Sequence, residues 1–347
     1  MVTLYVASSE PHAGKTLACV VLGMRWRAQQ RAVGYLKPLA PFAGQPADED
    51  ATFVAAQLGL PAAPSQLCPA LLTPDLCAEG PVSVRRRITE AFAAASAGKE
   101  VMLVSGSGSV LTRGAMIGLT GLKVAELLDA RVLLMAKCAV FADADTILAA
   151  VGALRTRLVG AILTRLPPKD IQEVRRTVVP CLEHAGATVL GFLPEDPALN
   201  SVSVREIAEE TEAQFLTCAE AGDELVEHLV VGAMSVESAL RYFRQTPRKC
   251  VVTGGDRGDV QLAALDTPTK CLVLTGDLRP NHIVLERATE LCVPVLLVKG
   301  DTLSTIAVIE GLLGNPSLRA PAKARYALKQ FEAHVDLAAL DTALGLT

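Results

Sequence analysis

A nine-residue stretch near the start of the chain has the residue types needed to hold a phosphate group. Residues 8–16 read S-S-E-P-H-A-G-K-T and follow an apolar run at residues 2–7. A Gly-Lys-Thr sequence between a strand and a helix directs backbone N–H groups toward an anion, while the lysine reaches the phosphates and the threonine offers a hydroxyl to Mg²⁺. We therefore predict a phosphate-binding loop, which consists of His12, Ala13, Gly14, Lys15, Thr16 and Leu17.

The beginning of this loop departs from the usual pattern. The pattern is G-x-x-x-x-G-K-[ST], and here Ser9 stands in place of the first glycine while Pro11 stiffens the loop. The alternative to phosphate binding is a helix start that has kept only the shape of the motif.

Charged residues follow at the ends of the next predicted elements. Lys37 ends an apolar strand, where ligands of open α/β sheets bind, so it either faces an anionic substrate or reaches into solvent from the sheet edge. Asp48 and Asp50 either cap a helix at 51–58 or complete a Mg²⁺ shell with Thr16. Thr16 and Asp50 are the candidate metal ligands.

The third strand ends in a residue that argues against fast catalysis. Nucleotide hydrolases and ligases usually carry a metal-facing carboxylate there, and this chain has Ser105. Phosphoryl transfer depends on neutralising charge, and a hydroxyl holds Mg²⁺ only weakly. The sequence therefore predicts binding more firmly than reaction.

Two series of strands and helices position these residues. Apolar strand-length runs alternate with helix-length segments over about 200 residues, which predicts a doubly wound parallel sheet. Residues 61–81 contain five prolines and predict an irregular connection, either a lid or a linker. A second, smaller α/β series begins near residue 229. We place the domains at 1–205 and 206–347, and expect the helical tail from residue 321 to pack on the second domain or on a partner chain.

A glycine-rich turn in the second series is another candidate site. Residues 253–259 read T-G-G-D-R-G-D between a predicted strand and helix. Gly255, Asp256 and Arg257 either bind an anionic ligand or form a tight turn with an internal Arg–Asp pair.

Composition excludes several classes of protein. The 347 residues are half apolar with a net charge of −4, which offers no broad cationic surface to nucleic acid. No apolar segment reaches the ~20 residues that span a bilayer, and the start lacks a signal-peptide pattern. The nine cysteines are scattered without a C-x-x-C pair, which is typical of free thiols in a reducing compartment. We expect a cytoplasmic protein.

Several segments resemble one known arrangement. E10-P-H-A-G-K-T, Y35-L-K-P-L and D50-A-T-F-V-A-A-Q-L-G-L resemble the dethiobiotin-synthetase-like P-loop region at the start of long phosphate acetyltransferases. V231-G-A-M-S-V-E-S-A-L-R-Y-F and V251-V-T-G-G-D-R-G-D resemble the DRTGG domain beside it, with Gly258 in place of the usual threonine. The resemblance implies a P-loop NTPase-like α/β domain followed by a smaller α/β DRTGG domain.

The resemblance also implies roles. It matches Lys15, Thr16 and Asp50 to residues that hold Mg-ATP, Lys37 to a substrate-binding lysine, and Ser105 to a metal-binding glutamate. In the long enzymes the N-terminal region is associated with metabolite regulation and oligomer formation, and a further domain, before which this chain stops, carries acetyl transfer. We therefore expect no acetyltransferase activity.

Three hypotheses follow. The first is a homo-oligomeric regulatory or assembly protein that binds ATP, ADP or a phosphorylated metabolite and partners a metabolic enzyme. The second is an ATP-dependent carboligase that uses Lys37 to grip a carboxylate or carbamate. The third is a scaffold in which both loops are relics.

Overall fold

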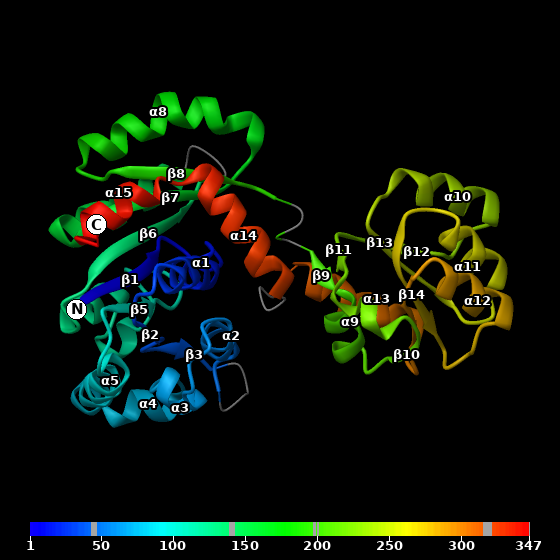
Figure 1. Cartoon of the computed structure of the whole chain (residues 1–347), viewed down its shortest axis with the longest axis horizontal. Coiled ribbons are helices and arrows are strands. Elements are labelled where there is room, and N and C mark those ends of the chain that lie inside the picture. Colours follow the sequence, from blue (N-terminus) through cyan, green and yellow to red (C-terminus); the bar gives the residue numbers. More distant parts are fainter. Residues whose placement is uncertain (43–46, 139–142, 197–198, 200, 315–320, 347) are drawn as a thin grey trace. The chain divides into compact units, whose positions relative to one another are not determined.

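The computed structural model describes residues 1–42, 47–138, 143–196, 199, 201–314 and 321–346. The chain forms two compact units (Figure 1): the first comprises Met1–Glu195 and Ala324–Thr347, and the second comprises Asp196–Lys323. This division differs from the predicted one, because the chain leaves the first unit about ten residues before residue 205 and its tail returns to that unit.

The first unit contains the predicted parallel sheet. Its six strands are all parallel and lie in the order β2-β5-β1-β6-β7-β8. The middle strands are buried on both faces, which explains their continuous apolar sequences. The strands are β1 (Val2–Ser8), β2 (Val33–Leu36), β5 (Val101–Ser105), β6 (Arg131–Lys137), β7 (Leu158–Leu166) and β8 (Val189–Pro194).

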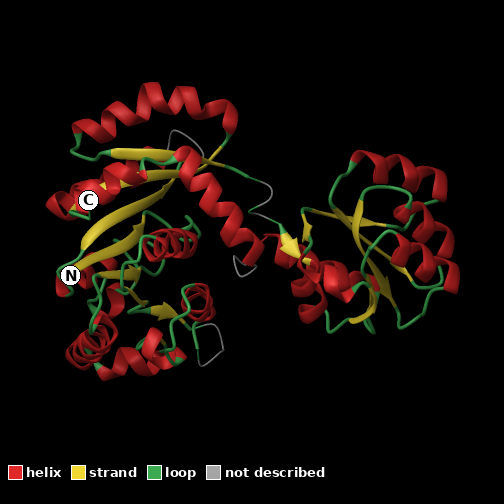
Figure 2. Ribbon diagram, in the orientation of Figure 1, coloured by secondary structure: helices red, strands yellow, loops and turns green. Residues whose placement is uncertain are grey.

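Helices cover both faces of this sheet (Figure 2). Buried residues of α5, α6, α7 and α8 form one apolar cluster with the face that carries Tyr5 and Ala7. On the other face, α1 contacts β1, β2 and β5, while α15 contacts β7 and β8. The helices are α1 (Lys15–Ala28), α2 (Glu49–Gln57), α5 (Pro81–Ser96), α6 (Gly121–Leu127), α7 (Asp143–Leu154), α8 (Ile171–His184), α14 (Pro321–His334) and α15 (Leu337–Leu344).

The proline-rich segment 61–81 is more regular than predicted. It contains the short helices α3 (Pro64–Leu67) and α4 (Pro74–Glu79), and strand β4 (Leu71–Leu72), which pairs with β3 (Ala40–Pro41). Each of these helices begins at a proline, a position where the missing N–H costs nothing. The prolines therefore start helices here instead of preventing them.

The second unit has a five-stranded sheet in the order β10-β15-β14-β13-β12. Helices α10, α11 and α12 pack on one face, while α9 and α13 pack on the other. The antiparallel edge strand β10 and the small pair β9–β11 were not predicted. The elements are β9 (Val202–Ser203), α9 (Val204–Glu210), β10 (Gln214–Thr217), β11 (Leu225–Val226), β12 (His228–Val231), α10 (Val236–Gln245), β13 (Lys249–Gly254), α11 (Gly258–Leu265), β14 (Thr269–Thr275), α12 (His282–Glu290), β15 (Val295–Leu297) and α13 (Thr302–Gly314).

The C-terminal tail is held on the first unit by specific contacts. The Asp341 carboxylate of α15 accepts hydrogen bonds from the Trp26 indole at 2.8 Å and the Arg25 guanidinium at 2.7 Å. A Cβ atom on Gly191 would lie 2.2 Å from the carbonyl oxygen of His334, so the tail passes directly over β8. Helical periodicity revealed the apolar face of the tail, but it could not identify the surface that this face covers.

The cysteines and the apolar helices were also the subject of predictions from the sequence. The cysteines whose side chains are described are free thiols, five of which are buried, and Cys77 lies outside the described side chains. Among the described helices, none combines the length and apolar character needed to cross a membrane.

Candidate phosphate-binding site

The predicted phosphate-binding loop connects β1 to α1. Gly14 caps the N-terminus of α1 in the left-handed conformation, with a φ of 90°. The nearest atom to a Cβ at this position would be 3.9 Å away, so glycine is required by its backbone conformation and not by lack of space. The N–H groups of the first turn of α1 therefore begin at Lys15, as an anion site requires.

Lys15 is held in place by a neutral partner. Its ammonium group donates a hydrogen bond to Ser8 Oγ at 2.7 Å, and within the described residues it has no ion-paired carboxylate. Burial, together with the positive charge of Lys37, lowers the pKa of Lys15 to about 8. An anion bound beside Lys15 would relieve this unfavourable environment.

Three neighbouring strands fix the loop. The Ser8 hydroxyl, which accepts from Lys15, lies 2.6 Å from the carbonyl oxygen of Glu10 and 2.8 Å from that of Gly108. From β7, Thr164 donates a hydrogen bond to the carbonyl oxygen of Ala13 at 3.3 Å. The Ser9 N–H donates to the Met135 carbonyl at 3.2 Å. The loop is thus positioned by the core of the sheet.

Lys37 neither points into solvent nor stands free for a substrate. It is 5% exposed, and its ammonium group lies 2.8 Å from the Asp48 carboxylate and 3.2 Å from that of Asp50. Burial lowers the pKa of Lys37, but the two carboxylates outweigh this effect and raise it overall. A carboxylate substrate would have to compete with both aspartates, and the substrate role of Lys37 stays a prediction.

Asp48 and Asp50 have different positions on α2. Asp48 is the N-cap, and its side chain accepts a hydrogen bond from the Ala51 N–H at 2.8 Å. Asp50 lies in the first turn, where its carboxylate pairs with Lys37. Sequence reasoning missed this triad, although a lysine at the end of a fully apolar strand is itself a signal that a carboxylate partner is needed.

The residues at the site do not fit a tightly held Mg²⁺. Ser105 is buried at the end of β5 and supplies no charge, and Asp50 is already paired with Lys37. The part of the chain that the structure describes contains no group of three or more His, Cys, Asp or Glu residues able to hold a metal. Mg²⁺ prefers several oxygen ligands with at least one free carboxylate, so Thr16 would have to bind it with little help.

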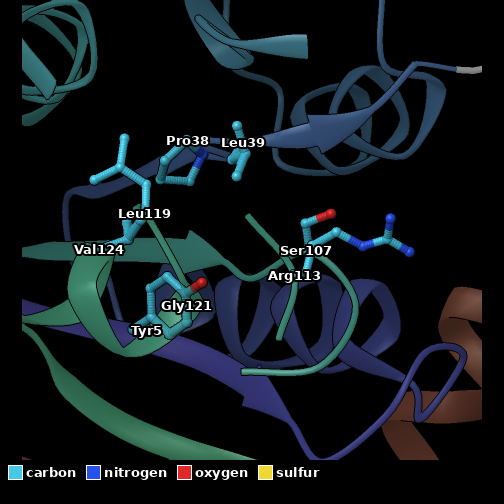
Figure 3. Close-up of a pocket in the computed structure, with 8 residues that line it drawn as sticks. All are labelled: Tyr5, Pro38, Leu39, Ser107, Arg113, Leu119, Gly121 and Val124. Carbon is cyan, nitrogen blue, oxygen red and sulfur yellow. The ribbon is translucent and has the colours of Figure 1, made fainter. Parts of the chain in front are cut away.

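The loop after β5 contributes residues that the sequence analysis did not identify. A small pocket is lined on one side by Ser107 and Arg113 and elsewhere by apolar residues and Tyr5 (Figure 3). The Ser107 hydroxyl is buried and has no hydrogen-bond partner among the described residues. A serine- and glycine-rich sequence followed by an arginine is only a weak signal, and the fold is needed to bring it beside Ser8.

The glycine-rich turn of the second unit lies between β13 and α11. A Cβ atom on Gly255 would lie 1.7 Å from the carbonyl oxygen of Leu278, so only glycine fits. Arg257 donates a hydrogen bond to the carbonyl oxygen of Met234 at 3.0 Å and lies 3.8 Å from the Asp259 carboxylate. These contacts form the tight turn, and ligand binding by Gly255, Asp256 and Arg257 stays a prediction.

Family models match nearly the whole chain. A model described as an AAA domain matches residues 2–203, which is more than half of the chain. The chain belongs to this AAA-domain family. A second model, described as the DRTGG domain, matches residues 206–312. The predicted resemblance to a dethiobiotin-synthetase-like P-loop region followed by a DRTGG domain is thereby confirmed.

Curated relatives carry the name phosphate acetyltransferase. One from Pseudomonas putida is 26% identical over 99% of this chain and 52% of its own length. One from Synechocystis is 30% identical over 52% of this chain and 27% of its own length. The chain thus spans about half or less of the length of these relatives.

Solved structures show weaker likenesses. One contains the CBS and DRTGG domains of the regulatory region of Clostridium perfringens pyrophosphatase with its activator, diadenosine tetraphosphate. It is 23% identical over 32% of this chain and 47% of that chain, with a TM-score of 0.29. The cell division protein MinD of Aquifex aeolicus is 14% identical over 57% of this chain and 84% of that chain, with a TM-score of 0.37.

Proposed function

We propose that the first unit binds an adenine nucleotide or a similar phosphorylated metabolite, and that the chain acts as a homo-oligomeric regulatory or assembly protein. The observation that carries the binding proposal is the position of Lys15. It lies at the start of α1 directly after Gly14, whose backbone is left-handed, is partly buried, and has only the neutral Ser8 as a hydrogen-bond partner among the described residues. Such a lysine lacks the counter-charge that a phosphate group supplies.

The regulatory part of the proposal has a different basis. The chain pairs a P-loop region with a DRTGG domain, the combination that the resemblance links to regulation in long phosphate acetyltransferases. Ser105 at the end of β5 favours binding over phosphoryl transfer, because it cannot supply the negative charge that holds a catalytic metal. We extend the proposal to a metabolic enzyme as partner and to the cytoplasm as location.

Isothermal titration tests the binding proposal. We expect ATP or ADP to give a saturable heat with the wild-type protein, and Lys15→Ala to weaken binding by a factor of ten or more, because charge-assisted hydrogen bonds to phosphate are lost. Lys123→Ala is the matched control, since Lys123 lies on the surface of α6 and pairs with Glu126. Wild-type protein that gives no heat with either nucleotide would refute the proposal.

The carboligase alternative has less support from the site. It needs Lys37 to grip a carboxylate or carbamate, and Lys37 is already neutralised by Asp48 and Asp50. It also needs a metal-bound phosphate, for which Thr16 and Asp50 provide a poor ligand set. ADP release that depends on a small acid and disappears in Lys37→Ala would restore this alternative.

A further inference from the structure

The loop after β5 holds two polar groups that phosphate binding by Lys15 leaves unexplained. Ser107 is 8% exposed, and its hydroxyl has no hydrogen-bond partner in the described part of the chain. Arg113 is exposed, and none of the described carboxylates forms an ion pair with its guanidinium. A buried hydroxyl without a partner is uncommon in folded proteins, and it indicates a group supplied by water or by a ligand.

A chain of short contacts connects these groups to the phosphate-binding loop. Lys15 donates to Ser8 Oγ at 2.7 Å, and the same oxygen lies 2.8 Å from the carbonyl oxygen of Gly108. A Cβ atom on Gly108 would lie 2.8 Å from Arg113 Nε, so the guanidinium packs against the backbone that contacts Ser8. Ser8 and Gly108 therefore link Lys15 to Arg113 at the carboxyl ends of β1 and β5.

The pocket beside Ser107 and Arg113 is small, about the size of a water molecule. Ser107 and Arg113 lie on one side of it, and Tyr5, Leu119 and Val124 lie on the other (Figure 3). A pocket of this size is too small for a nucleobase. It suits a single oxygen of an anionic group whose remaining atoms lie at the pocket mouth, within reach of the arginine.

The loop after β5 carries a positive side chain, whereas a metal site there would need a negative one. Ser105 provides no carboxylate, and eight residues later the same loop provides a cation. We infer that Arg113 and Ser107 form a second anion subsite, which binds the second phosphate group of a diphosphate or polyphosphate whose first phosphate is held by Lys15. In this arrangement the guanidinium supplies the positive charge between neighbouring phosphates. The inference rests on the proposed nucleotide binding at Lys15.

Titrations with ADP and with inorganic phosphate, each in EDTA and in excess Mg²⁺, test the subsite. We expect the wild-type protein to bind ADP as well in EDTA as in Mg²⁺. Arg113→Gln should weaken ADP binding about tenfold or more and change phosphate binding less than about twofold. Ser107→Ala should weaken ADP binding several-fold without lowering the melting temperature, because its hydroxyl has no partner among the described residues of the free protein.

Arg85→Gln is the matched control, because Arg85 is an exposed arginine on α5. ADP binding by Arg113→Gln at wild-type strength, or loss of wild-type ADP binding in EDTA, would overturn the subsite. If Lys15→Ala loses ADP while Arg113→Gln retains it, only the subsite fails. If the wild-type protein binds neither ADP nor phosphate, both the proposed function and the subsite fail.

Discussion

At the scale of single residues, the titration of Lys15 couples phosphate binding to pH. Burial lowers its pKa to about 8 in the free protein, and a bound phosphate would raise the pKa by favouring the charged form. Binding therefore takes up a proton near pH 8, and the affinity for the phosphate falls as the pH rises above 8. We expect the heat of ADP binding at pH 8 to vary with the ionisation enthalpy of the buffer.

A variant isolates this effect from other titrating groups. In Lys15→Arg the side chain keeps its charge at every accessible pH, so the dependence on pH between 7 and 9.5 should disappear even if affinity is lower. An affinity of the wild-type protein that stays constant across that range would show that Lys15 does not contact the anion.

At the scale of elements, the docking of α15 should stabilise the first unit. Asp341 is 8% exposed and satisfies the buried indole N–H of Trp26. Asp341→Ala leaves that N–H without its partner, which costs about 1–3 kcal/mol. The measurement is urea unfolding followed by far-ultraviolet circular dichroism.

The control for this prediction is Glu332→Ala, which removes an exposed carboxylate from the neighbouring helix α14. It should change the free energy of unfolding by less than about 0.5 kcal/mol. Equal stability of Asp341→Ala and wild type would mean that α15 contributes little to the first unit.

At the scale of the whole molecule, each unit has its own apolar core, so we expect two unfolding transitions. Trp26 is the single tryptophan of the chain and lies in the first unit, so its fluorescence reports that unit alone. ADP at 100 times its Kd should stabilise this transition by about 2.7 kcal/mol and leave the second unchanged.

Calorimetry combined with Trp26 fluorescence makes the comparison, and Lys15→Ala serves as the variant that should not respond. A ligand that shifts only the transition without fluorescence change would place nucleotide binding in the second unit. One transition reported identically by both methods would show that the units unfold together.

Much of the fold follows from local patterns in the sequence. Apolar runs such as residues 101–104 are typical of strands buried on both faces of a parallel sheet, and Gly14-Lys15-Thr16 after such a run marks the loop that begins α1. The DRTGG turn is likewise visible, because three glycines lie between an apolar strand-length run and a helix-length segment. These features depend on residues that are neighbours along the chain.

Contacts between distant residues were decided only by the tertiary structure. The sequence by itself determined two α/β regions, a loop suited to phosphate and the missing carboxylate at Ser105. It could not show that Lys37 pairs with Asp48 and Asp50, that the tail returns to Trp26, or that Arg113 packs beside the loop at Ser8. Periodicity reveals which face of an element is buried, whereas the partner of that face depends on how all the elements pack together.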